Sequence, residues 1–171
     1  MKKGQLAEGV IDHIVFPNKG IAVTEEGEKV VTLGEIIHNN TIIKALENYG
    51  VTVEDDYLKI PTDATVVIRA HGVPECVYKH FQEQGVNYID ATCPFVSKIH
   101  RKVENVDAKN SVVLIAGNAE HPEVIGIRGF CKAPAYIFSS AEELQEILDR
   151  NVEEFKQKEI FVVSQTTFSL K

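Results

Sequence analysis

Residues 90–100, DATCPFVSKIH, place a cysteine between the end of an apolar run and the start of a predicted helix. Pro94 suits the first position of that helix, where its missing N–H costs nothing. A structural cysteine is more typical of the middle of an apolar run, where it packs as a small hydrophobe. A helix N-terminus instead favours the thiolate, the form that binds metal or attacks a substrate. Cys93 is therefore a candidate for chemistry.

The rest of the chain repeats this order: an apolar strand, polar residues at the end of the strand, and a helix. The runs VVTLG, ATVVIRAHG, VNYIDATC, SVVLIAGNAEHPEV, PAYIFSS and EIFVVSQTTFS each end in polar or glycine-bearing residues. Helical patterns follow most of them, including residues 141–155, where Ser140 and Glu143 form a predicted capping box. Near-continuous apolar strands that alternate with helices predict an α/β fold of mostly parallel sheets.

The predicted organisation is two tandem small three-layer subdomains after a short β-type segment. Residues 1–29 contain short strand-like runs around PNKG, whose residues favour a turn, and no helical pattern. We expect an incomplete first α/β subdomain over residues 30–93 and a second over residues 94–171.

The bulk composition narrows the class of protein. Of the residues, 44% are hydrophobic and 25% are charged, the balance of an ordinary globular protein. No run approaches the about 18 apolar residues of a membrane span, so we expect no membrane association. The net charge of −7 opposes a dominant nucleic-acid surface. Three cysteines without CxxC spacing indicate a reducing, cytoplasmic setting rather than a disulfide framework.

Polar side chains with chemical potential follow several predicted strands. Ligands bind at the carboxyl edge of open α/β sheets, because loops and helix N-termini converge there. Histidines, hydroxyls and helix N–H groups at that edge suit an anion such as phosphate, and a thiol with a proton donor suits redox or proton-coupled chemistry. The candidates are His38, His71, Cys93, His121, Glu123 and Thr166.

Each candidate also has a purely structural explanation. A histidine beside glycine is common in turns, a threonine is ordinary N-cap material, and a glutamate in a first helical turn complements the helix dipole. The other helical histidines, His80 and His100, are expected at the surface or its boundary. Cys76 and Cys131 are expected to be buried fillers. Several donors, one thiol and one carboxylate at one sheet edge favour the functional explanation.

The sequences at the ends of the predicted strands resemble those of the 4-hydroxy-3-methylbut-2-enyl diphosphate reductase family from about residue 30 to residue 171. Five motifs carry the resemblance in this order: LGEIIHN, RAHGVP, DATCPFV, HPEVIG and SQTTFS. The family implies reductive removal of a hydroxyl from an allylic diphosphate, in non-mevalonate isoprenoid synthesis. It also implies a [4Fe–4S] cluster held by three cysteines and an electron donor such as ferredoxin or flavodoxin.

The resemblance assigns expected roles to single residues. Cys93 matches a cluster ligand, and His38 and His71 match histidines around the diphosphate. His121 matches a histidine that faces the substrate.

Two further residues match the family's proton relay. Glu123 resembles the carboxylate that passes a proton to the leaving hydroxyl, and Thr166 matches a residue beside that relay.

The family's first and third cysteine-bearing segments have no counterpart in the motifs, and Cys76 and Cys131 do not match ligand positions. We therefore expect a truncated or chimeric chain of low or no activity by itself. Residues 1–29 weakly resemble the RNA-binding barrel of RNA uracil-5-methyltransferases, although their charges are mixed.

Two other functions remain open at this point. The chain could be a non-catalytic anion- or RNA-binding module, although the acidic composition makes us expect no RNA. Alternatively, Cys93 could be a nucleophile with His71 or His121 as its base.

Overall fold

The computed structural model describes residues 10–15, 19–23, 29–35, 40–48 and 50–169. Its residues cluster into two compact units, which we describe separately. Unit 1 comprises Met1–Arg69 and Phe81–Ala91, and unit 2 comprises Ala70–His80 and Thr92–Lys171. The division of the chain at residue 93 that the sequence suggests stays a prediction.

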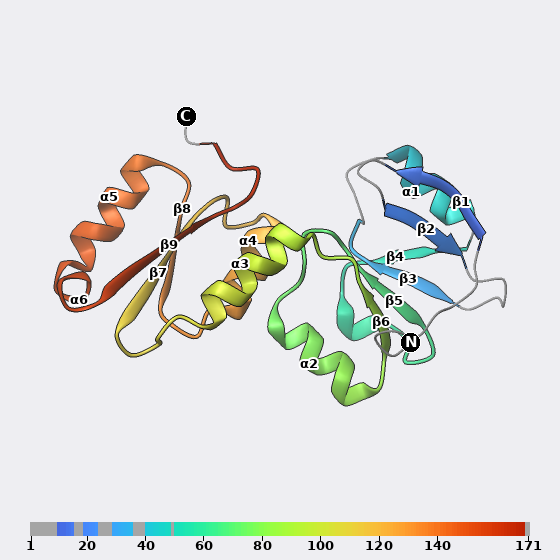
Figure 1. Ribbon diagram of the computed structural model, residues 1–171, viewed down its shortest axis with the longest axis horizontal. Helices are drawn as coiled ribbons and strands as arrows, with labels where there is room; N and C mark the ends of the chain where they lie inside the picture. The colour runs from blue at the N-terminus through green and yellow to red at the C-terminus, as the bar shows by residue number, and fades with distance from the viewer. Residues whose placement is uncertain (1–9, 16–18, 24–28, 36–39, 49, 170–171) are drawn as a thin grey trace. The chain divides into compact units, whose positions relative to one another are not determined.

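Unit 1 contains an antiparallel strand pair and a four-stranded parallel sheet (Figure 1). The pair joins β1 (Val10–Val15) to β2 (Lys19–Val23), which confirms the β-type runs expected there. The parallel sheet has the order β4-β3-β5-β6. Its strands are β3 (Val30–Leu33), β4 (Thr52–Glu54), β5 (Thr65–Ile68) and β6 (Asn87–Asp90).

Helical segments connect these strands. They are α1 (Asn40–Asn48), the 3-10 helix η1 (Tyr57–Lys59) and α2 (Glu75–Gln84), whose residues divide between the two units. Gly50 and Gly85 follow α1 and α2 with φ of 81° and 68°, a region that favours glycine. The short strand β4 and η1 lack a clear apolar pattern, and the sequence analysis did not identify them.

Unit 2 is built around a three-stranded parallel sheet of order β8-β7-β9. The strands are β7 (Ser111–Ala116), β8 (Ala135–Phe138) and β9 (Glu159–Ser164). In Figure 1, α3 (Pro94–Glu104) and α4 (Pro122–Phe130) cover one face, and α5 (Ala141–Arg150) covers the other. Helix α6 (Val152–Gln157) follows α5 and leads into β9.

The central strand β7 explains why the sheet is covered on both faces. All six of its residues are buried. Val113 and Ile115 belong to the cluster formed with α3 and α4, whereas Leu114 and Ala116 pack toward residues of β8, α5 and α6. Successive side chains of a strand point to opposite faces, so a wholly apolar run requires two apolar neighbours. The predicted α/β class with mostly parallel sheets is confirmed.

Helix ends in unit 2 follow the local sequence signals. Pro94 occupies the start of α3, as predicted. Ser140 caps α5, because its Oγ accepts a hydrogen bond from the backbone N–H of Glu143 at 3.1 Å. The Glu143 carboxylate accepts from the backbone N–H and hydroxyl of Ser139, one residue before the cap. The helix expected over residues 141–155 is divided at Asn151 into α5 and α6.

None of the described helices has the length and apolar character that a bilayer crossing requires.

Candidate functional site

The carboxyl edge of the unit 2 sheet brings together residues far apart in sequence. Strand β7 ends at Ala116, and its parallel partner β9 ends at Ser164. The backbone N–H of Gln165 continues the ladder by donating to the carbonyl of Ala116 at 2.9 Å. The loops after both strands therefore start side by side, and α4 begins at the end of one of them.

Glu123 and Thr166 form the central contact of this edge. One Glu123 carboxylate oxygen accepts from the backbone N–H of Thr166 at 2.6 Å, and the other accepts from its hydroxyl at 2.9 Å. Glu123 is only 2% exposed, and no salt bridge to it occurs among the described residues. Thr166 is exposed. A hydroxyl in contact with both a buried carboxylate and the outside can pass a proton between them.

His121 lies at the N-cap of α4. Its Nδ1 accepts a hydrogen bond from the backbone N–H of Glu123 at 3.2 Å, as a side-chain cap does. Since Nδ1 accepts, the neutral ring carries its proton on Nε2, which we infer from this hydrogen bond. Nε2 is then a donor that an anion or a hydroxyl can use.

His71 meets His121 edge to face. Their ring centroids are 5.3 Å apart, with an angle of 87° between the ring planes. His71 follows β5 in the chain but belongs to unit 2. The structure thus brings together His71, His121, Glu123 and Thr166 in one unit.

Gln165 is a site residue that the sequence analysis missed. It is buried, its Oε1 accepts from the backbone N–H of Asn118 at 3.2 Å, and its Nε2 donates to the Thr167 hydroxyl at 2.9 Å. It therefore ties the loop after β7 to the turn that carries Thr166. The only sequence signal was its place between a strand and two threonines, which does not distinguish it from a surface glutamine.

Cys93 precedes α3 at its N-cap position and is partly buried. Its backbone N–H donates to the carbonyl of Ala70 at 2.9 Å, and its side chain makes no capping hydrogen bond. This location fits a thiolate ligand. The nucleophile hypothesis needs a base hydrogen-bonded to the thiol, and the Cys93 thiol makes no such bond to the described part of the chain.

The other cysteines do not fit a metal site. Cys131 is partly buried and its thiol donates to the carbonyl of Ile127. Burial raises the pKa of this thiol to about 11, against a smaller lowering by Arg128, so it stays protonated near neutrality. Cys76 lies exposed on α2, and its expected burial is wrong because the helix turns it to solvent. Within the described ranges, no three His, Cys, Asp or Glu residues form a metal-holding group.

His100 is also more buried than expected. It is 4% exposed and stacks on Phe130, with ring centroids 4.4 Å apart. Because α3 packs against α4, His100 faces inward, and its predicted surface or boundary location is wrong. His80 is partly buried, as predicted.

His38 lies outside the described residues. Gly34, directly after β3, has a φ of 71°. A β-carbon there would clash with the guanidinium of Arg69, which follows β5. Burial lowers the pKa of Arg69, and the negative charge of Asp55 partly offsets this effect.

Parallel sheets with polar groups at the strand ends define an α/β protein with a ligand site at a sheet edge. Within this class, the family model described as LytB protein matches residues 14–171. The chain belongs to the LytB family. The match includes residues 14–29, which are part of the segment that weakly resembles an RNA-binding barrel.

Curated relatives support this assignment. The chain is 40% identical over 147 residues to the 4-hydroxy-3-methylbut-2-enyl diphosphate reductase of Alkaliphilus oremlandii, covering 85% of this chain and 49% of that protein. It is 40% identical over 125 residues to the enzyme of that name from Caldanaerobacter subterraneus, covering 72% and 43%. The chain thus spans about half the length of the curated relatives it matches.

Solved structures give the same relationship. The E-1-hydroxy-2-methyl-but-2-enyl-4-diphosphate reductase from Plasmodium falciparum matches with a TM-score of 0.70 and 26% identity, over 84% of this chain and 43% of that one. A structure described as the terminal enzyme of the non-mevalonate pathway matches with a TM-score of 0.61 and 29% identity, over 82% and 58%.

Proposed function

We propose that this chain is the substrate-side part of a 4-hydroxy-3-methylbut-2-enyl diphosphate reductase. The reaction is R–OH plus two electrons and two protons, giving R–H and water. The allylic C–O bond breaks, a C–H bond forms, and one proton leaves with the hydroxyl as water. The relatives' names support this reaction, which makes the family an oxidoreductase of non-mevalonate isoprenoid synthesis.

The contact of Thr166 with Glu123 is the observation that carries the proposal. A leaving hydroxide needs a proton in the transition state, and a positioned acid contributes about 10²–10⁴-fold to such a step. For this step Glu123 must be protonated, so that it donates to the Thr166 hydroxyl in the reverse direction of the bond in the structure while that hydroxyl gives its own proton to the substrate oxygen. The two hydrogen bonds, at 2.6 and 2.9 Å, fix the carboxylate toward Thr166.

The diphosphate is bound by histidines. His121 and His71 offer imidazole donors beside the proton relay, and their edge-to-face contact keeps both rings oriented. The family resemblance implies a third histidine donor at His38, which lies outside the described residues. Charge-assisted hydrogen bonds to phosphate are about twice as strong as neutral ones.

Cys93 would hold a [4Fe–4S] cluster through one thiolate, and such a cluster would supply the electrons. Its place before α3 supports this role, whereas Cys76 and Cys131 do not fit, and the described residues do not complete the ligand set. Electrons would arrive from a protein donor such as ferredoxin or flavodoxin, in the cytoplasm.

Titration of the chain with 4-hydroxy-3-methylbut-2-enyl diphosphate tests the proposal. We expect saturable binding, and we expect about tenfold weaker binding in His121→Ala, since the ring donates to charged groups. His80→Ala, a helical histidine outside the site, is the matched control and should bind like the parent chain. Equal affinities of His121→Ala and the parent would contradict the proposal.

A further inference from the structure

Arg69 places a positive charge at the carboxyl edge of the unit 1 sheet. It directly follows β5, and its guanidinium lies against Gly34, which directly follows β3. A β-carbon at Gly34 would clash with Nη1 of Arg69 and would lie 3.0 Å from its Cζ. The guanidinium therefore occupies the space that a side chain at position 34 would fill.

This contact lies where the connections of the unit 1 sheet change direction. The sheet order is β4-β3-β5-β6. From β3 the chain passes to β4 on one side, returns to β5 on the other side of β3, and continues outward to β6. The carboxyl ends of β3 and β5 are therefore the topological switch point of the sheet, which is where open α/β sheets bind their ligands.

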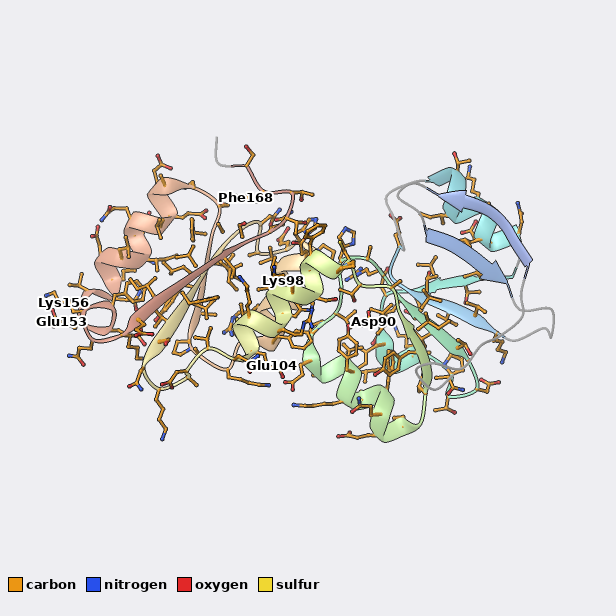
Figure 2. All side chains as sticks on the ribbon, viewed as in Figure 1. Asp90, Lys98, Glu104, Glu153, Lys156 and Phe168 are labelled. Atoms are coloured by element: carbon orange, nitrogen blue, oxygen red, sulfur yellow. The ribbon has the colours of Figure 1, made fainter. Side chains whose placement is uncertain are left out.

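The Arg69 guanidinium is not paired inside the protein. Within the described part of the chain it makes no hydrogen bond and no salt bridge, and its Nε is buried. Asp90, labelled in Figure 2, ends the neighbouring strand β6 but forms no ion pair with Arg69. Arginine is almost never buried without a partner, because removing its charge from water is costly. A partly buried and unpaired guanidinium at a switch point suits an anion from outside.

The acidic residues after β4 are engaged in their own turn. The Glu54 carboxylate accepts from the backbone N–H of Asp56 at 2.9 Å. Asp56 in turn caps η1 and forms a salt bridge with Lys59 at 3.4 Å. Asp55 only partly offsets the lowering of the Arg69 pKa that burial causes. The positive charge of Arg69 thus stays available to a ligand.

Unit 2 has a charged side chain at the corresponding place. In the order β8-β7-β9, the switch point lies between β7 and β9, and the contact of Glu123 with Thr166 joins the ends of these strands. Glu123 is satisfied by hydrogen bonds within its own unit, whereas Arg69 is not. This difference favours a ligand as the missing partner of Arg69.

We propose that Arg69 is an oxyanion-binding residue that holds a phosphoryl or carboxylate group at the switch point of unit 1. A guanidinium presents its donors in a planar fork, which matches two oxygens of either group. Since Nε is enclosed, the ligand contacts the two Nη groups. The negative charge of Asp55 nearby favours an anion of low charge. The inference goes beyond the proposed function, because it requires neither the site histidines nor Cys93.

Side-chain NMR of the whole chain tests this proposal. The probes are inorganic phosphate and acetate, added at constant pH and ionic strength, and the readout is the Nε–H signal of each arginine. We expect the Arg69 signal to shift saturably, with a dissociation constant on the order of 1 mM for a contact with one charged group. Arg101 is the matched control, because it is exposed and its Nε already donates to the carbonyl of Ser97. Its signal should not saturate.

Two matched pairs of variants locate the site, followed by the backbone amide signals of residues 33–35 and 68–69. Arg69→Gln should weaken phosphate binding about tenfold or more, since charge-assisted hydrogen bonds are lost, whereas Arg101→Gln should not change it. Gly34→Ala should weaken it as well, because the β-carbon displaces the guanidinium. Gly50→Ala is its control, since Gly50 has a φ of 81° and a β-carbon there meets nothing within 4 Å.

The titration of the parent chain decides the proposal even where a variant fails to fold. A tighter response to phosphate or to acetate supports the site and assigns the class of its ligand. No shift of the Arg69 signal, or equal shifts of the Arg69 and Arg101 signals, would overturn the proposal, since only non-specific anion binding would then remain. Equal weakening by Arg69→Gln and Arg101→Gln would do the same.

One further variant separates this site from the proposed function. His121→Ala disrupts the proposed diphosphate site and should leave the phosphate response of Arg69 unchanged. A lost response in His121→Ala would overturn the proposal, because the anion would then belong to the histidines. Failure of the oxyanion site and failure of the reductase function are therefore distinguishable.

Discussion

Thr166 and Glu123 are 43 positions apart, and their two hydrogen bonds join the ends of β9 and β7. The carboxylate is buried and the threonine is exposed, so the hydroxyl contacts both the interior and the sheet edge. These two hydrogen bonds stabilise the carboxyl edge of the unit 2 sheet, and they also position the proposed proton relay. Removal of the threonine hydroxyl leaves the buried carboxylate with one hydrogen bond fewer, which costs more than the bond itself contributes.

The first prediction concerns the threonine hydroxyl. Thr166→Val should lower the free energy of unfolding by about 1.5–3 kcal/mol, the range for hydrogen bonds to charged groups. Thr167→Val is the control, because its hydroxyl accepts from the uncharged Gln165 and its loss should cost about 0.5–1.5 kcal/mol. Urea unfolding of both variants gives the comparison. A larger loss in Thr167→Val would contradict the assigned geometry.

A second prediction at this scale concerns the cysteines. Burial raises the pKa of the Cys131 thiol to about 11. At any pH below that value, most Cys131 side chains are therefore protonated and unreactive toward alkylating reagents. Cys76 is exposed and meets reagents freely. Iodoacetamide labelling at pH 8, followed by mass spectrometry, should modify Cys76 well before Cys131. The rate at Cys131 should rise as the pH approaches 11, and a fast, pH-independent reaction would contradict this.

At the scale of elements, His100 connects α3, α4 and the loop after β5. A β-carbon at Gly72 would lie 2.6 Å from Cε1 of His100, and one at Gly126 would lie 3.2 Å from its Nε2. The imidazole therefore fills the space that two glycines leave, and Phe130 stacks on it. This packing fixes the backbone beside His71 and the helix that carries Glu123.

Two glycines with similar dihedral angles allow a matched test. Gly72 and Gly85 have φ of 73° and 68°, but a β-carbon at Gly85 meets nothing within 4 Å. Gly85→Ala should cost about 1–2 kcal/mol for the left-handed conformation alone. Gly72→Ala should cost a further ~1–3 kcal/mol for overpacking. Chemical denaturation measures both, and equal losses would show that His100 does not constrain the loop.

Much of this architecture was predictable from local sequence. The apolar run of β7, Pro94 at the start of α3 and the Ser140 cap each follow from one short segment. Contacts between distant segments were not predictable in the same way. The inward position of His100 depends on Phe130, and the role of Gln165 depends on Asn118, which lies 47 residues away. Helical periodicity and turn signals carry no information about such pairs.

At the scale of the whole molecule, substrate binding and cluster assembly depend on different residues of the chain. The unit 2 edge supplies donors and a carboxylate, whereas the described residues supply one cysteine in a fitting position. A cluster of the [4Fe–4S] type is normally held by several thiolates, so one thiolate binds it weakly.

Iron content tests this separation. After anaerobic reconstitution, we expect less than about one iron per chain that depends on Cys93, judged by comparison with Cys93→Ala. Cys131→Ala is the control and should not change the iron content, because that thiol is buried and protonated. About four irons per chain, lost in Cys93→Ala, would mean that the chain or an oligomer of it completes the site.

The most direct measurement of the reductase function is the activity of a graft. Residues 14–171 would replace the matching segment of the Alkaliphilus oremlandii enzyme, which is 40% identical over 147 residues. The account predicts reduction of 4-hydroxy-3-methylbut-2-enyl diphosphate by the graft, and a loss of about 100-fold or more in its Glu123→Gln form. The exposed Glu120→Gln is the control and should keep the activity. A folded, iron-loaded graft that is inactive, or that is equally active with Glu123→Gln, would contradict the account.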